Sequence, residues 1–277
     1  MTRPQAPSEN IPATADTPDD ELASGGLRVH VDGTVTTITL DRPETKNSQT
    51  PATWRALRAV GAGLDPATRV VVVRGAGGTF SSGLDRRMLT PEGVGGESLV
   101  TLLAMTDQDL ADTIAGYQEG FTWLRRPDIV SVAAVEGHAI GAGFQLALAC
   151  DLRIVTDDVS FSMREPLLGL VPDLTGTKPL VDAVGYSRAL EICATGRSVG
   201  AAEARELGLA TAVVPSAELE QSIADLVAAL TAPMAGAVSG TKALLQQAAD
   251  VDLDEQRRSE REAQVRRFRE LASLMGQ

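Results

Sequence analysis

The chain has 277 residues, 43% hydrophobic and 22% charged, enough to bury a full core as one large domain or as one domain with a helical appendage. Its 25 basic and 37 acidic residues give a net charge of −12, which excludes nucleic acid as a general partner because a phosphate backbone needs a basic surface. No apolar run approaches the roughly 20 residues that span a bilayer, and the amino terminus lacks a signal pattern. We therefore expect a cytoplasmic protein with no membrane partner.

Cysteine and histidine usage argues against a metal centre. The two cysteines, Cys150 and Cys193, lie in apolar helical patterns and are expected to be reduced core residues. The two histidines, His30 and His138, are too few to form a ligand cluster with them.

The amino-terminal third predicts a tail followed by strands and a helix. Residues 1–25 are rich in proline and acidic residues and lack apolar periodicity, so we expect a disordered acidic tail. Residues 27–40 predict two strands joined by a turn at Asp32-Gly33. A helix is expected from Pro51, since proline suits the first helical turn.

The next segment combines a buried strand with a loop and helices. Residues 69–74 hold four valines flanked by charge, which is typical of a strand buried on both faces. Residues 91–96 are glycine-rich and predict a mobile loop, which could be a lid or an ordinary loop. Residues 98–124 predict a helix in two pieces.

The central stretch, residues 129–151, predicts a buried strand over 129–135, a tight glycine turn and a helix from near Phe144. Gly141, Ala142 and Gly143 let a ligand approach the backbone closely. The free N–H groups at the helix start suit an anion or a developing oxyanion, although the same pattern also occurs for packing alone.

A second turn, residues 79–87, follows the valine strand in the same way. One N–H group from each turn would make a two-donor site for a carbonyl oxygen. Arg86 and Arg87 could hold a phosphate group, or could be solvated surface residues.

The remainder predicts short strands and then helices. Strands are expected at 152–155 and 159–161, and helices follow from Ala189 onward. Residues 253–275 carry six arginines and an apolar stripe, which we expect to need a partner such as another subunit.

Five spaced motifs occur in one order: LDRPETKNS (40–48), FSSGLD (80–85), AVEGHAIGAGFQLALACDLRI (134–154), FSMREPLLGLVPDLTGT (161–177) and ATGRSVGAAEARELGLATAVVP (194–215). With them the chain resembles the enoyl-CoA hydratase/isomerase (crotonase) superfamily over residues 27–249. The resemblance implies an α/β fold: a crotonase-like spiral of ββα repeats over residues 26–205 and a helical oligomerisation region over 206–277. It also implies an acyl-CoA thioester ligand, no cofactor beyond the coenzyme A of the substrate, and a homotrimer or homohexamer.

The resemblance also implies roles for individual residues. The backbone N–H groups of Leu84 and Ala142 would form an oxyanion hole. The residues expected to bind coenzyme A or substrate are Ser48, Ser82, Gly83, Leu84, Asp85, Arg86, Arg87 and Gly141.

One position departs from the family's hydratases, which carry two glutamates where this chain has Gln145 and Glu165. An amide cannot act as a general base, so the two-glutamate addition of water cannot run in its usual form. Asp173 lies where several isomerases of the family carry an acid. We therefore predict an isomerase that shifts the double bond of an enoyl-CoA, with Glu165 as acid and base.

Several alternatives remain at this point. Gln145 could position water for a hydratase, or the chain could bind acyl-CoA without turnover. Glu165 could be a salt-bridged loop residue, Asp173 either a helix cap or a proton relay, and His138 a packing residue. The sequence does not define the acyl group.

Overall fold

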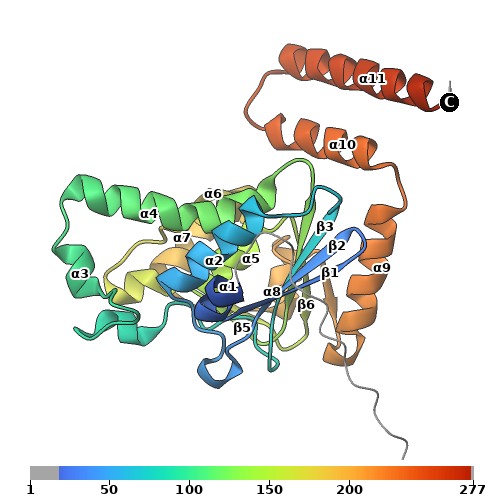
Figure 1. Ribbon diagram of the computed structural model, residues 1–277. Helices are drawn as coiled ribbons and strands as arrows, with labels where there is room; N and C mark the ends of the chain where they lie inside the picture. Colours follow the sequence, from blue (N-terminus) through green and yellow to red (C-terminus); the bar gives the residue numbers. More distant parts are fainter. Residues whose placement is uncertain (1–18, 276–277) are drawn as a thin grey trace, which may run out of the picture.

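Figure 1 shows that residues 19–275, the part of the chain that the computed structural model describes, form an α/β fold around a six-stranded sheet. The strands lie in the order β1-β2-β3-β4-β6-β9, and β1 with β2 is the antiparallel pair among parallel neighbours. They span Leu27–Asp32 (β1), Val35–Leu40 (β2), Val70–Gly75 (β3), Val130–Val135 (β4), Leu152–Thr156 (β6) and Ala212–Val214 (β9). Because β3 and β4 are parallel, the turns that follow them leave the sheet at the same edge.

A second sheet has three strands, and one of them, β5 (His138–Ile140), lies between β4 and the glycine turn. The other two are β7 (Ser160–Ser162) and β8 (Val199–Gly200). The sequence predicted a glycine turn directly after β4, and this was wrong because β5 intervenes and carries the turn. Helix α5 then begins at Ala142, two residues before the predicted start.

The valine strand β3 has its side chains in two hydrophobic clusters. Val71 and Val73 belong to the main core, whereas Val70 and Val72 pack in a smaller cluster beneath α9 (Leu219–Thr231). The prediction of a strand buried on both faces is confirmed.

The helices confirm most of the sequence predictions, including the start at Pro51 and the two pieces within 98–124. Besides α9, they are α1 (Asp19–Gly25), α2 (Pro51–Ala62), α3 (Leu99–Leu103), α4 (Asp107–Thr122), α5 (Ala142–Ala149), α6 (Thr177–Val184), α7 (Tyr186–Thr195), α8 (Ala201–Glu206), α10 (Ala235–Gln247) and α11 (Leu253–Met275).

Two predicted boundaries are wrong. The acidic tail was placed over residues 1–25, but residues 19–25 form α1, which packs on α2 and buries Leu22. Residues 1–18 lie outside the described residues. The region 206–277 is not wholly helical, because β9 belongs to it and completes the main sheet.

Asp173 does not cap a helix, in contrast to one sequence interpretation. Helix α6 begins at Thr177 with Gly176 as its N-cap. Thr175 has a φ of +68°, in the left-handed region, so the chain cannot enter a helix directly after Asp173.

Helices α10 and α11 form an arm that stands away from the sheet (Figure 1). Lys242 of α10 holds the arm to the core, since its Nζ donates hydrogen bonds to the carbonyl of Ile129 and to the Asp151 carboxylate, each at 2.7 Å. In α11, Val265 and Phe268 are 55% and 60% exposed. Within residues 19–275 no single helix is long and apolar enough to cross a membrane; only the sharply bent pair 216–231 and 235–247 reaches that length and composition together.

Candidate active site

The turn after β3 lies directly against the turn before α5. Gly83 has a φ of +87°, and a Cβ atom built there would lie 2.4 Å from the Ile140 carbonyl oxygen and 3.5 Å from the Ala142 nitrogen. A side chain would fit neither the backbone conformation nor the space, so the position requires glycine. The turn after β3 and the turn before α5, which the sequence analysis expected to form one site, are thus in contact.

The Leu84 amide faces away from the segment beside it. The Gln49 nitrogen donates to the Gly83 carbonyl at 2.7 Å, and the Gln49 carbonyl accepts from the Asp85 nitrogen at 2.8 Å. In such a parallel bridge, the residue between the two bonded positions, here Leu84, directs its own N–H away from the Gln49 segment. Among the described residues, no hydrogen bond uses the N–H of Leu84.

Helix α5 offers further unpaired donors. Ala142 is its first residue, and its N-cap, Gly141, has no side chain to accept a hydrogen bond. Every residue of α5 is buried. The N–H of Ala142 therefore sits at the positive end of a helix dipole, in surroundings that exclude water.

Gln145, one turn into α5, uses both ends of its amide and is fully buried. Its Oε1 accepts hydrogen bonds from the nitrogens of Leu174 (2.9 Å) and Gly176 (3.2 Å). Its Nε2 donates to Glu165 Oε1 at 2.7 Å. The side chain thus fixes the 174–176 loop and orients a carboxylate.

Glu165 begins a 3-10 helix, Glu165–Leu168, and turns its carboxyl toward the start of α5. A Cβ atom at Gly141 would lie 3.2 Å from Glu165 Oε1, so the carboxyl fills the space that this glycine leaves. Glu165 Oε2 is buried and has no hydrogen-bond partner within the described part of the chain. A buried carboxylate oxygen without a partner is available to a ligand.

The surroundings raise the pKa of Glu165. Burial is the largest cause, and the negative charge of Asp173 adds to it, while the hydrogen bond from Gln145 acts the other way. Asp173 is an exposed residue, yet the atoms that cover part of its carboxyl raise its pKa as well. Because solvent screens Asp173, Glu165 is the stronger candidate for acid and base.

The comparisons with known proteins identify the family. The family model for enoyl-CoA hydratase/isomerase matches residues 30–276. The chain belongs to the enoyl-CoA hydratase/isomerase family.

Solved structures and curated relatives in this family are similar along most of the chain. A Thermobifida fusca YX protein assigned as an enoyl-CoA hydratase, solved in complex with CoA, is 51% identical with a TM-score of 0.89, over 94% of this chain and 100% of that one. The same protein in complex with acetoacetyl-CoA is 52% identical, also with a TM-score of 0.89, over 92% of this chain and 99% of that one.

The curated relatives include both activities of the family. The "Probable enoyl-CoA hydratase" of Rhizobium meliloti (strain 1021) is 33% identical, covering 76% of this chain and 77% of its own. The mitochondrial Delta(3,5)-Delta(2,4)-dienoyl-CoA isomerase of Rattus norvegicus is also 33% identical, covering 79% of this chain and 67% of its own. The family is therefore established, whereas hydration and isomerisation both occur among the relatives.

Three of the residues predicted to bind coenzyme A, namely Ser48, Asp85 and Arg87, lie together around the buried carboxylate of Asp85. Asp85 accepts hydrogen bonds from Arg87, Arg42 and the Ser48 hydroxyl. The bonds from Arg87 are the largest cause of a pKa far below the usual range for aspartate. The Arg87 guanidinium is thus already paired, while Arg86 is exposed without an ion pair among residues 19–275.

Other predicted residues have simpler surroundings. The Ser82 hydroxyl donates to the Thr45 carbonyl at 3.1 Å. His138 is exposed on β5, whereas the sequence analysis favoured packing or a backbone hydrogen bond for its side chain; packing in the core is thus excluded. Cys150 is buried and Cys193 half-buried, and both are free thiols.

The sequence interpretation missed three side chains that support this site. Gln118 of α4 donates to the Asp173 carbonyl at 2.7 Å, and Gln49 and Ser81 surround the Gly83 turn. No spacing or composition signal distinguishes such residues from other buried polar side chains.

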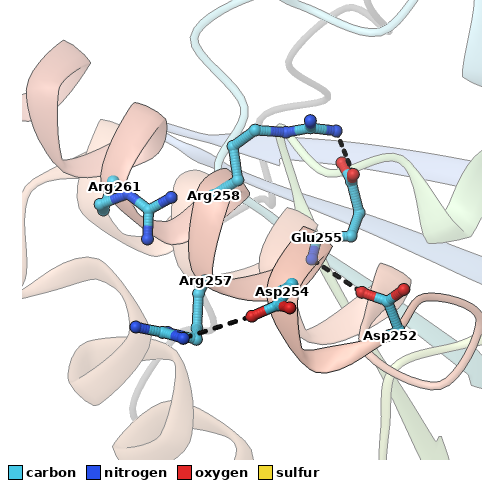
Figure 2. Close-up of a pocket in the computed structure, with 6 residues that line it drawn as sticks. All are labelled: Asp252, Asp254, Glu255, Arg257, Arg258 and Arg261. Atoms are coloured by element: carbon cyan, nitrogen blue, oxygen red, sulfur yellow. Dashed lines mark hydrogen bonds and ion pairs between the residues drawn. The ribbon is translucent and has the colours of Figure 1, made fainter.

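A depression on α11 lies away from this site. It is lined by charged residues of one helix and the loop before it: Asp252, Asp254, Glu255, Arg257, Arg258 and Arg261. Figure 2 shows Arg257 paired with Asp254 and Arg258 paired with Glu255. Three acidic and three basic side chains line the depression, so their formal charges balance.

Proposed function

We propose that this protein isomerises an enoyl-CoA, moving the double bond along the acyl chain by transfer of one proton. The observation that carries the proposal is the buried Glu165 Oε2, which has no partner among the described residues and lies beside the start of α5. The family supplies the acyl-CoA thioester as substrate class.

In this mechanism the thioester oxygen accepts hydrogen bonds from the N–H groups of Leu84 and Ala142. Glu165 removes a proton from the acyl chain, the electrons move onto the thioester oxygen, and a dienolate forms. The protonated Glu165 then returns a proton at the other end of the conjugated system, which leaves the double bond displaced. If Asp173 supplies that proton instead, the proton on Glu165 must pass to Asp173 through solvent before the next cycle. One well-placed donor is worth about 3 kcal/mol to such an oxyanion, so two donors supply much of the activation.

The pKa of Glu165 suits both halves of this cycle. A carboxyl whose pKa is raised is a stronger base than an ordinary glutamate, and it can hold the proton and give it back. No metal or further cofactor takes part in these steps.

The alternative, hydration with water positioned by Gln145, is less well supported. Both ends of the Gln145 amide are already engaged: Oε1 accepts two hydrogen bonds and Nε2 donates one. Both acceptor sites of Oε1 are therefore filled, so Gln145 can donate its second Nε2 proton to a water molecule but has no site left to accept a proton from it.

A second candidate function is acyl-CoA binding without turnover. It would keep the two amides but would not need a carboxyl with a raised pKa, which is the specific feature that favours catalysis.

The test incubates the protein with a 3-enoyl-CoA and a 2-enoyl-CoA in deuterium oxide. We expect a conjugated product from the 3-enoyl-CoA, seen by its absorbance, and no hydroxyacyl product. Return of the same proton by Glu165 should leave most of the product without deuterium. Hydrated product would support the hydratase, and tight binding with neither product would support the binding protein.

The variant Glu165→Gln should lose at least about a hundredfold in kcat, the scale of general acid-base catalysis, and keep acyl-CoA affinity within a few fold. Glu206→Gln, which changes an exposed glutamate of α8, is the control. Unchanged turnover in Glu165→Gln would remove this residue from the mechanism.

We also propose that the protein assembles as a homotrimer or homohexamer. The exposed apolar side chains of α11 support this, because such a stripe is stabilised when a second copy covers it.

A further inference from the structure

The two proposed amide donors come from different turns, so their separation depends on how those turns are joined. Ser81, three residues before Leu84, pairs with β5 through both main-chain groups: its nitrogen donates to the His138 carbonyl (2.8 Å), and its carbonyl accepts from the Ile140 nitrogen (3.0 Å). A Cβ atom at Gly143 would lie 2.6 Å from the Ser81 carbonyl oxygen. Ser81 is therefore packed against the start of α5.

The Ser81 hydroxyl holds the other turn. It accepts hydrogen bonds from the Gly83 nitrogen (3.2 Å) and from Gln49 Nε2 (3.1 Å), and it donates to the Asn47 carbonyl (2.7 Å). A serine hydroxyl has one donor and two acceptor sites, so all three are used.

Gln49 completes the network on the far side of the turn. Its main chain brackets Leu84, its Nε2 bonds Ser81, and its Oε1 accepts from Trp54 Nε1 at 2.9 Å. Ser81 and Gln49 are both fully buried. A buried polar network in which every member is satisfied is rigid, because any shift leaves a group unpaired.

We propose that Ser81 is a positioning residue whose hydroxyl, braced by Gln49, holds the N–H of Leu84 in register with the N–H of Ala142. The inference rests on the proposed function, since it concerns how those two donors reach one oxygen. Ser81 acts through the backbone and does not touch the substrate. Its loss should therefore weaken stabilisation of the oxyanion more than binding of the acyl-CoA.

The test measures oxyanion stabilisation without turnover. Acetoacetyl-CoA bound to the protein ionises to an enolate that absorbs in the near ultraviolet, and the pH midpoint of that change reports how strongly the donors favour the negative oxygen. In Ser81→Ala we expect the midpoint to rise by about one pH unit, a tenfold weaker preference for the enolate. For the enoyl-CoA reaction, kcat should fall about ten- to a hundredfold with KM within about threefold, as expected for a small misplacement.

Ser131→Ala is a matched control. Ser131 is also fully buried, and its hydroxyl also takes part in three hydrogen bonds, with the Leu124 carbonyl and with the carboxylate and nitrogen of Asp151. It should lose stability as Ser81→Ala does but leave the midpoint unchanged. Ser81→Cys, which nearly keeps the side-chain volume and weakens the bonds, should shift the midpoint in the same direction and serves if Ser81→Ala does not fold.

The outcomes separate the inference from the function on which it rests. If the unmodified protein does not lower the midpoint below that of free acetoacetyl-CoA, the two-amide site itself is wrong. If it does, but Ser81→Ala and Ser81→Cys keep the same midpoint, the positioning role of Ser81 is overturned.

Discussion

At the scale of single residues, the candidate site depends on glycines that leave room for other groups. Gly83 makes space for the Ile140 carbonyl and the Ala142 amide, and Gly141 makes space for the Glu165 carboxyl. The functional groups themselves are two main-chain amides and one carboxylate, so the sequence reveals them only indirectly.

Gly83→Ala should abolish activity because its methyl group would push the two turns apart. Gly78→Ala is the matched control: Gly78 also has a positive φ, of +70°, but a Cβ atom there would have no other atom within 4 Å. The left-handed backbone should cost both variants about 1–2 kcal/mol of stability, and Gly83→Ala should lose more because its methyl group also meets the Ile140 carbonyl. Thermal unfolding and kcat together test this, and equal activity in the two variants would contradict it.

The raised pKa of Glu165 also predicts a dependence of stability on pH. The folded state holds the proton more tightly than the unfolded state, so this residue favours folding below about pH 4.5, its ordinary pKa, and that contribution is lost as the pH rises through the raised value. At neutral pH the buried charge therefore opposes folding.

Glu165→Gln removes this charge, so it should unfold at a higher temperature than the unmodified protein at pH 7 and at nearly the same temperature near pH 4. Melting curves of both proteins across this pH range give the difference in melting temperature. The other carboxylates are the same in both proteins, so their contributions cancel in this difference. A difference that is constant with pH would show that Glu165 ionises normally.

At the scale of elements, α5 joins the parts of the site. Its first residue offers an amide, and one turn later Gln145 fixes both the 174–176 loop and Glu165. The left-handed Thr175 lies inside that loop, so Gln145 helps to maintain a strained backbone conformation.

Gln145→Met keeps the length of the side chain but removes its hydrogen bonds. Two buried N–H groups would lose their partner at a cost of about 1–3 kcal/mol each, so we expect lower kcat and faster amide exchange across residues 173–177. Gln221→Met, at an exposed position of α9, is the control. Unchanged exchange in this loop would contradict the bracing role.

The helices and strands show why the sequence predicted only part of the fold. Four consecutive valines predicted β3 and Pro51 predicted the start of α2, because both depend on local pattern. The short strands β5 and β8 have no such pattern, since they exist through pairing with β7. The helix cap, one of two alternatives for Asp173, does not form, and Gln145, distant in sequence, bonds the backbone of the 174–176 loop instead.

The site was predictable to a similar extent. Glycine patterns indicated the two turns, and Glu165 followed from the family motif. Asp85 looked like a ligand contact, but in the fold its carboxylate holds Arg42 and Arg87, which no local pattern shows. The residue-level roles remain predictions that the variants test.

At the scale of the whole molecule, the position of the α10–α11 arm does not follow from packing in the hydrophobic core. It is tied to the body by Lys242, and apolar side chains of α11 remain exposed. A buried pair such as Lys242 with Asp151 fixes the direction in which the arm leaves the body.

Val265→Asp combined with Phe268→Asp should shift the protein to a smaller species in sedimentation or light scattering. The melting temperature of the isolated chain should change little, because both side chains are exposed. Arg266→Asp, which changes the adjacent residue on another face of α11, is the control. An unchanged mass in the double variant would contradict assembly through this stripe.

The two free thiols give the protein an internal asymmetry that labelling chemistry could use. Burial raises the pKa of Cys150 to about 12, so this thiol should resist alkylating reagents while the chain stays folded. Burial and the negative charge of Glu165 also raise the pKa of Cys193, but this thiol is only half-buried and so is more accessible to reagents than Cys150. A fluorescent maleimide would therefore attach selectively next to the proposed reaction centre, where its emission could report the arrival of each thioester without any engineered cysteine.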